Sequence, residues 1–291
     1  MHITGRVYKA LVATLLMVFA PAISVCAEGE TTFVRVAEDD QNQPLALQIA
    51  IASYAPKSGG SRVDLISAIH IGDREYYEEL NNRFHSYDAL LYELVAPRDA
   101  VVSRPDSERR GVISSTQIMM KNMLELSFQL DEINYDAGNF VHADLTPAEL
   151  SQSMDERGES LYVYFWRLFY ASINQYAKDP LGLNDMQMLS AVLSNDSDNS
   201  FKIMLAYEMT DLDTLRDILG DDADSAVIGA RNQRAIDVLR AQLDAGAKRI
   251  AIFYGVAHMP DMERRMIDQL DLVYLDTTWV DAWRLDTSAN R

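Results

Sequence analysis

Two histidines occupy equivalent places in two distant parts of the chain. His70 ends the apolar segment ISAIH, and His258 ends the apolar segment YGVAH. Each is followed by a helical pattern and then by a second apolar segment, which runs to Glu93 in the first case and to Asp276 in the second. This repetition indicates two related strand-helix-strand units. If the two units are related by a pseudo-twofold axis, His70 and His258 face one crevice.

The residue types at these strand ends suit metal chemistry. Ligands of open α/β sheets bind beyond the carboxyl ends of the strands, and two imidazoles with a carboxylate are the usual minimum of a catalytic metal site. The pattern predicts that His70, His258 and Glu93 bind a divalent cation such as Mn²⁺, Co²⁺ or Zn²⁺. Glu93 is then the third ligand or the base that takes a proton from water. The plainer alternative is two structural histidines and a Glu93 that pairs with an arginine.

A third histidine lies in the segment NFVHADLT, between two helical patterns. His142 and Asp144 in this segment have side chains that bind metals or polar substrates. His142 is therefore predicted to contribute to substrate binding by closing the site. Asp144 or Thr146 could instead cap the helix that begins at Pro147.

Strands at both ends of the chain, with helices between them, must position these residues. Residues 31–56 have the pattern of a hairpin, and residues 62–95 and 248–283 have the pattern of the two strand-helix-strand units. Residues 115–245 are mostly helical in pattern. The predicted fold class is α/β, with a mixed sheet from the N- and C-terminal strand-helix-strand units, an N-terminal β-hairpin and a helical insertion in the middle. In the first unit, the order of elements favours a parallel strand pair joined by a crossover helix.

Two other segments could contribute to a site. Residues 96–114 contain two prolines and many charges, which predicts a long loop that is either a lid or only a surface excursion. The aromatic segment 161–176 is too short to span a membrane. Its pattern is that of a buried helix, or else of the wall of a substrate groove.

The first 27 residues have the pattern of a secretory signal peptide: basic residues, an apolar run and then small residues before a cleavage point after Ala27. Residues 28–291 are then a single exported domain, periplasmic or secreted. Cys26 is the only cysteine, so the mature chain would contain no disulfide and no catalytic thiol. The alternative is a lipoprotein acylated at Cys26, which Val25 directly before it disfavours.

The net charge and the distribution of apolar residues limit which classes of partner the chain is expected to bind. The formal net charge of −18 disfavours nucleic acid as a partner and favours cationic ligands or metal ions. Beyond the signal there is no apolar run of about 18 residues, so no membrane span is predicted after cleavage.

The chain has no Gly-x-Ser-x-Gly motif and no glycine-rich phosphate loop after a strand. Among enzyme classes, these absences favour metal-assisted hydrolysis of a peptide or small-molecule substrate.

These segments together resemble the TraB/GumN/Tiki family. The resemblance is carried by VDLISAIHIGDREYYEELNNRFHSYDALLYEL, followed much later by GARNQRAIDVL and IAIFYGVAHMPDM. Members of this family carry two Gly-x-x-His motifs, a glutamate that closes the second strand and an Arg-Asn pair on a late helix. The resemblance covers most of the mature chain. It implies that Glu93 and Arg231 are catalytic residues, that Asn232 contributes to substrate binding, and that Gly255 and His258 form the second motif.

The first motif departs from the family pattern, because Ser67 stands where glycine is expected before His70. Tiki-like members are described as metal-dependent proteases, so the resemblance implies an exported, peptidase-like metal-dependent hydrolase. The wider group includes erythromycin-esterase-like and ChaN-like haem-binding proteins, which share the fold without sharing one chemistry. The alternatives are therefore a periplasmic protein that binds a peptide or haem on the same fold, and a catalytically degenerate family member.

Overall fold

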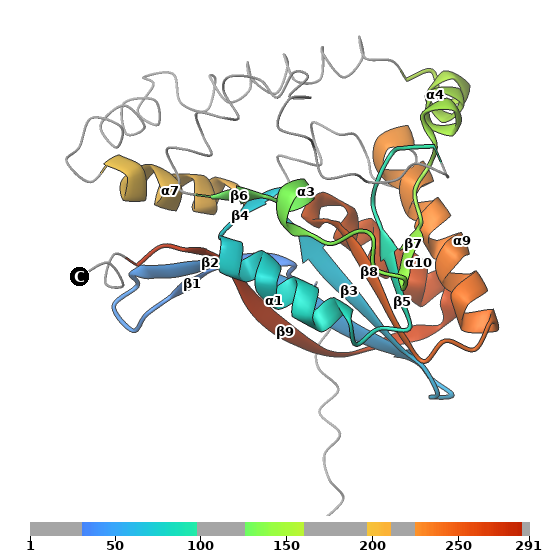
Figure 1. The fold of residues 1–291 in the computed structure, drawn as a ribbon, viewed down its shortest axis with the longest axis horizontal. Helices are drawn as coiled ribbons and strands as arrows, with labels where there is room; N and C mark the ends of the chain where they lie inside the picture. Colours follow the sequence, from blue (N-terminus) through green and yellow to red (C-terminus); the bar gives the residue numbers. More distant parts are fainter. Residues whose placement is uncertain (1–30, 98–125, 160–196, 211–224, 287–291) are drawn as a thin grey trace, which may run out of the picture. The chain divides into compact units, whose positions relative to one another are not determined.

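A mixed sheet of seven strands forms the centre of the protein (Figure 1). The computed structural model describes residues 31–97, 126–159, 197–210 and 225–286. The predicted signal peptide, nearly all of the 96–114 loop and the aromatic segment 161–176 lie outside these residues. Among the described helices, none has the length and apolar character needed to cross a bilayer.

The long strand β2 (Pro44–Pro56) pairs antiparallel with three other strands. Its first half pairs with β1 (Val34–Glu38) and its second half with β3 (Arg62–Ala68). Both of these lie on the same side of β2, because β9 (Leu272–Arg284) pairs along the whole of the other side. The predicted N-terminal hairpin is confirmed as β1 and β2.

The other half of the sheet is parallel. It continues from β3 through β8 (Arg249–Gly255) and β5 (Ala89–Tyr92) to β7 (Phe140–His142). The mixed α/β sheet built from both ends of the chain is thus confirmed, but β3 and β5 are not the adjacent pair that their order in the sequence favours. The strand β8 lies between them, with its backbone paired to β3 along one edge and to β5 along the other, and its side chains are mostly buried and apolar. This insertion brings the strand that precedes His258 between those that precede His70 and Glu93.

The two crossover helices lie on opposite faces of the sheet. The helix α1 (Arg74–Phe84) leads from β3 to β5, and α10 (Met259–Leu270) leads from β8 to β9 in the opposite direction across the sheet. Right-handed crossovers in opposite directions place their helices on opposite faces. On the face of α10, α9 (Arg231–Asp244) packs against both α10 and β8.

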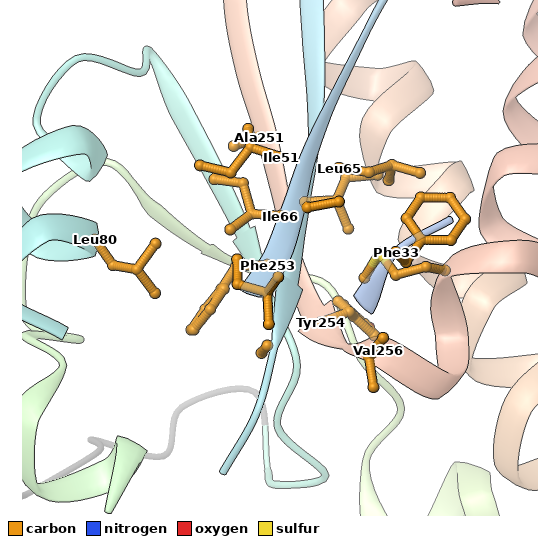
Figure 2. Close-up of a cluster of buried hydrophobic side chains, with 14 of the residues drawn as sticks. Phe33, Ile51, Leu65, Ile66, Leu80, Ala251, Phe253, Tyr254 and Val256 are labelled. Carbon is orange, nitrogen blue, oxygen red and sulfur yellow. The ribbon is translucent and has the colours of Figure 1, made fainter. Parts of the chain in front are cut away.

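Alternate residues of the central strands build a core on each face. The rings of Phe84 in α1 and Phe253 in β8 lie 5.0 Å apart, whereas the next residue, Tyr254, packs on the other face with its ring 5.3 Å from that of His258. Figure 2 shows the same division, with Leu80 and Phe253 on one side of the strands and Leu65 and Tyr254 on the other. The central parallel strands β3, β8 and β5 are buried on both faces, as expected for parallel strands.

The described residues in the middle of the chain form helices and two short strands. Its described helices are α3 (Gln129–Glu132), α4 (Pro147–Glu156), α7 (Ser197–Glu208), the π-helical turn η1 (Ala226–Ala230) and α9. It also supplies β7 at the sheet edge and β6 (Ser127–Phe128), which pairs with β4 (Ile71–Gly72) directly after His70. At the start of α4, Thr146 and Glu149 form a capping box, so Thr146 and not Asp144 is the cap.

Candidate functional site

Glu93 and Gly255 meet where two neighbouring parallel strands end. Tyr92 of β5 is paired with Phe253 of β8, so the residues that follow them lie together at the carboxyl ends of these two strands. The N–H of Gly255 donates to Oε2 of Glu93 over 2.7 Å. A Cβ atom at position 255 would lie 3.3 Å from that oxygen. Glycine therefore gives the glutamate room to approach the backbone closely.

Arg231 joins Glu93 to a second carboxylate. It is the first residue of α9, and its guanidinium donates from Nη2 to Oε1 of Glu93 over 2.7 Å. The same guanidinium donates to Asp144 from Nε over 2.9 Å and from Nη2 over 2.6 Å. The side chain of Asp144 is fully buried, and it follows β7, the neighbour of β5. A two-point contact of this kind fixes both the position and the plane of the guanidinium.

His258 is buried beside Arg231 and Glu93, and hydrogen bonds with Asn232 set the orientation of its ring. The amide Nδ2 of Asn232 donates to the carbonyl oxygen of His258 over 3.1 Å and to Oδ2 of Asp261 over 2.8 Å. The amide oxygen of Asn232 therefore faces Nδ1 of His258, at 2.7 Å. This assignment places the ring proton on Nδ1 and leaves a lone pair on Nε2.

The unprotonated Nε2 of His258 accepts a hydrogen bond from Nη1 of Arg231 over 3.4 Å. It also lies 3.6 Å from Oε1 of Glu93. Four segments of the chain thus meet in one hydrogen-bonded group. We call this group the strand-end network and define it as Glu93, Asp144, Arg231, Asn232 and His258.

Electrostatics hold the network in one protonation state near neutral pH. Burial lowers the pKa of His258 to about 4, and Arg231 adds to this while Glu93 opposes it. Burial alone would raise the pKa of Glu93, but His258, Arg231 and the N–H of Gly255 together lower it to about 2. Burial also opposes the charge on Arg231, yet its bonds to Asp144 and the charge of Glu93 raise its pKa. At pH 7 the network therefore contains a neutral imidazole, an ionised glutamate and a charged guanidinium.

The other two predicted histidines are near the network but outside its hydrogen bonds. His70 is exposed, and its ring makes no hydrogen bond to any described residue, although it is close enough to help lower the pKa of Glu93. The half-buried His142 has Nε2 2.7 Å from the carbonyl oxygen of Leu94, and its ring packs 5.7 Å from that of Tyr92. The structure thus brings together Glu93, Arg231, Asn232 and His258 of the predicted residues.

Two of the three predicted metal donors suit a cation. The Nε2 lone pair of His258 and the ionised Oε1 of Glu93 lie 3.6 Å apart, and both are unprotonated near neutral pH. His70 does not complete the set: across the described ranges, no three His, Cys, Asp or Glu side chains are grouped so that they could hold a metal ion. His258 and Glu93 would therefore supply two of the coordination positions of a cation. The charged guanidinium of Arg231 would be a neighbour of any cation held there.

The contacts of two aspartates in the site were not predicted from the sequence. Asp144 was expected to cap α4 or to help close the site, and its bond to Arg231 depends on β7 joining the sheet next to β5. Asp261 lies on the first turn of α10, three residues after His258, and accepts hydrogen bonds from Asn232 and from Arg264 and Arg265. Its spacing from His258 was a usable signal, since residues three apart share a helix face.

Comparison of the chain with protein-family models, with curated proteins and with solved structures found no match. The resemblance to the TraB/GumN/Tiki family thus rests on its sequence motifs alone and stays a prediction. Function has to be inferred from the geometry and charges of the strand-end network.

Proposed function

We propose that this chain is an exported, metal-dependent hydrolase that cleaves a peptide or another amide or ester, in the manner of the TraB/GumN/Tiki-like proteins it resembles. The observation that carries the proposal is the convergence of Glu93 and His258, in unprotonated form, at adjoining strand ends with Arg231 between them and Asp144. Ligands of open α/β sheets bind beyond the carboxyl ends of the strands, which is where these residues lie.

The low pKa values favour cation binding over unaided base catalysis. A general base works best when its pKa lies near the working pH, whereas the pKa of His258 is about 4 and that of Glu93 about 2. Metal ligands, in contrast, have to be deprotonated. A divalent cation held by His258 and Glu93 would supply the Lewis acidity that lets water attack a carbonyl group near neutral pH.

The remaining residues have positioning and electrostatic roles. Asn232 keeps the proton of His258 on Nδ1, so that Nε2 faces the site. Asp144 holds the guanidinium of Arg231 in place. Arg231 keeps Glu93 ionised and presents a fixed positive charge that would stabilise an oxyanion as negative charge develops on it. Asn232 is fully buried, so its part in substrate binding is indirect, through His258.

Calorimetry on the metal-stripped mature chain tests the proposal. Mn²⁺, Co²⁺ and Zn²⁺ are titrated in turn, and hydrolysis of a mixture of internally quenched decapeptides is measured with each metal. We expect binding of at least one cation, and we expect His258→Ala and Glu93→Gln to weaken it by at least tenfold and to abolish hydrolysis. His85→Ala is the matched control, since His85 is exposed at the end of α1. Unchanged cation affinity in both site variants would refute the proposal.

A second candidate is a binding protein for a peptide or haem that uses the same site without turnover. It is favoured by the position of Arg231, whose guanidinium already neutralises Glu93 and faces Nε2 of His258. The two candidates differ in what happens to the ligand. A Soret band after reconstitution with haem, or recovery of an intact decapeptide after long incubation with metal, would identify a binding protein.

A further inference from the structure

A buried side-chain pair lies beside the strand-end network. Gln129 comes directly after β6, and its N–H donates to the carbonyl oxygen of His70 over 3.0 Å. Its amide Nε2 donates to the hydroxyl of Tyr135 over 2.8 Å. The ring of Tyr135 packs 5.4 Å from that of Tyr92, the residue before Glu93. The pair of Gln129 and Tyr135, called here the amide-phenol pair, thus contacts the ends of both strands that lead to His70 and Glu93.

Both members of the pair have an unused hydrogen-bonding group. Oε1 of Gln129 is buried and has no hydrogen-bond partner among the described residues. The hydroxyl of Tyr135 accepts from Gln129, and no described residue accepts the proton of that hydroxyl. Gln129 is 6% exposed and Tyr135 9% exposed. Buried polar groups without partners are rare and unfavourable, so each calls for an explanation such as a ligand.

Rigidity makes the pair suitable for recognition. The ring of Tyr135 also packs 5.6 Å from the ring of Phe140 in β7, so it contacts side chains of two neighbouring strands, β5 and β7. Burial raises the pKa of Tyr135 to about 12, and therefore its hydroxyl keeps its proton at neutral pH. The pair offers one fixed acceptor, Oε1 of Gln129, and one fixed donor, the hydroxyl of Tyr135.

We propose that the amide-phenol pair binds one residue of an extended peptide substrate, with Oε1 of Gln129 accepting its N–H and the hydroxyl of Tyr135 donating to its C=O. The N–H and C=O of one residue point to the same side of an extended strand, which is how antiparallel strands exchange two hydrogen bonds. An acceptor and a donor placed together are complementary to this arrangement. The inference rests on the proposed function and deepens it, because it selects peptides over other amides and esters.

An ester scan tests the assignment without requiring turnover. The probe is an internally quenched decapeptide from the hydrolysis mixture, together with a series in which each backbone amide in turn is replaced by an ester, which removes one N–H. Binding to the full mature chain is measured in EDTA, so that hydrolysis does not interfere. We expect one ester position to weaken binding by about tenfold, the size of one good hydrogen bond.

The variants assign that position to the pair. In Gln129→Met, which keeps the side-chain length and removes the acceptor, the same ester should bind as well as the amide. In Tyr135→Phe the peptide should bind about tenfold more weakly while the ester effect persists. Gln152→Met is the matched control, because Gln152 is exposed on α4. Thermal unfolding checks that all three variants are folded.

The outcomes separate this inference from the proposed function. If the position-specific ester effect survives in Gln129→Met, or if no ester position matters in the unsubstituted chain, the inference is wrong. Failure of the unsubstituted chain to bind the decapeptide also overturns it. If the effect is lost in Gln129→Met but the peptide is never hydrolysed with any metal, the inference stands and the hydrolase proposal fails.

Discussion

The two strand-end histidines differ more in the folded protein than in the sequence. His258 is buried, both of its ring nitrogens face polar groups, and its ring packs on Tyr254. His70 is exposed, and its ring makes no hydrogen bond to a described residue. The same local motif has therefore produced one histidine whose orientation is determined by its neighbours and one whose ring meets solvent.

The segments directly after the two histidines explain the difference. After His258 the chain enters α10 at once, with Pro260 in the first turn, so the histidine is held against Asn232 of the adjacent helix α9. After His70 the chain first forms β4, and α1 begins only at Arg74. A histidine at the end of a strand is thus held in a fixed orientation when a second element, here α9, supplies a hydrogen-bond partner for its ring.

The largest expected effect is on stability. His258→Ala should lower the free energy of unfolding by about 3 kcal/mol, because it leaves a cavity and removes the partner of the buried Asn232 amide. His70→Ala should change it by no more than about 0.5 kcal/mol, as is usual for an exposed side chain. Urea unfolding of both variants measures the difference. Equal losses of unfolding free energy would mean that His70 and His258 contribute equally to stability, which would contradict the comparison.

The second effect concerns pH. Burial lowers the pKa of His258 from 6.5 to about 4, in surroundings that include Glu93, Arg231, Asp144 and Asp261. The unfolded chain therefore binds a proton at higher pH than the folded chain, so this contribution to stability is complete above about pH 6.5 and is lost as the pH falls toward 4. Between pH 7 and pH 5 the loss should be about 2 kcal/mol.

Paired variants assign this pH dependence to one histidine. The loss between pH 7 and pH 5 should be absent in His258→Gln and retained in His70→Gln, with urea unfolding at each pH as the measurement. Glu93 acts in the same direction at lower pH, since its pKa falls from 4.5 to about 2. A slope that is unchanged in His258→Gln would show that other groups cause the acid destabilisation.

The smallest effects come from equivalent small residues, three positions before each histidine. Gly255→Ala should destabilise by about 1 kcal/mol, because the new Cβ would lie 3.3 Å from Oε2 of Glu93. Ser67→Ala should be neutral or stabilise by up to about 1 kcal/mol, because it removes a buried hydroxyl that has no hydrogen-bond partner among the described residues. Gly138→Ala is the control, since its Cβ meets nothing within 4 Å. Effects of the same sign at 67 and 255 would contradict the asymmetry.

Local pattern in the sequence was enough to predict the elements. Tyr77, Leu80 and Phe84 repeat at helical spacing and are the buried face of α1, and the apolar runs before His70 and His258 are strands. The capping box at Thr146 and the hairpin of β1 and β2 result from residues close together in the chain. Neighbouring residues determine such features, so a sequence reports them directly.

The order of the strands and the depth of burial depended on the tertiary structure. No local pattern indicates that β8 lies between β3 and β5, that Asp144 is held by a residue 87 positions away, or that His258 is buried while His70 is exposed. These outcomes depend on pairing between distant segments, and each backbone edge is equally able to pair with several others. The sequence by itself thus determined which residues end the strands, and only the fold decided which of them meet and which remain in solvent.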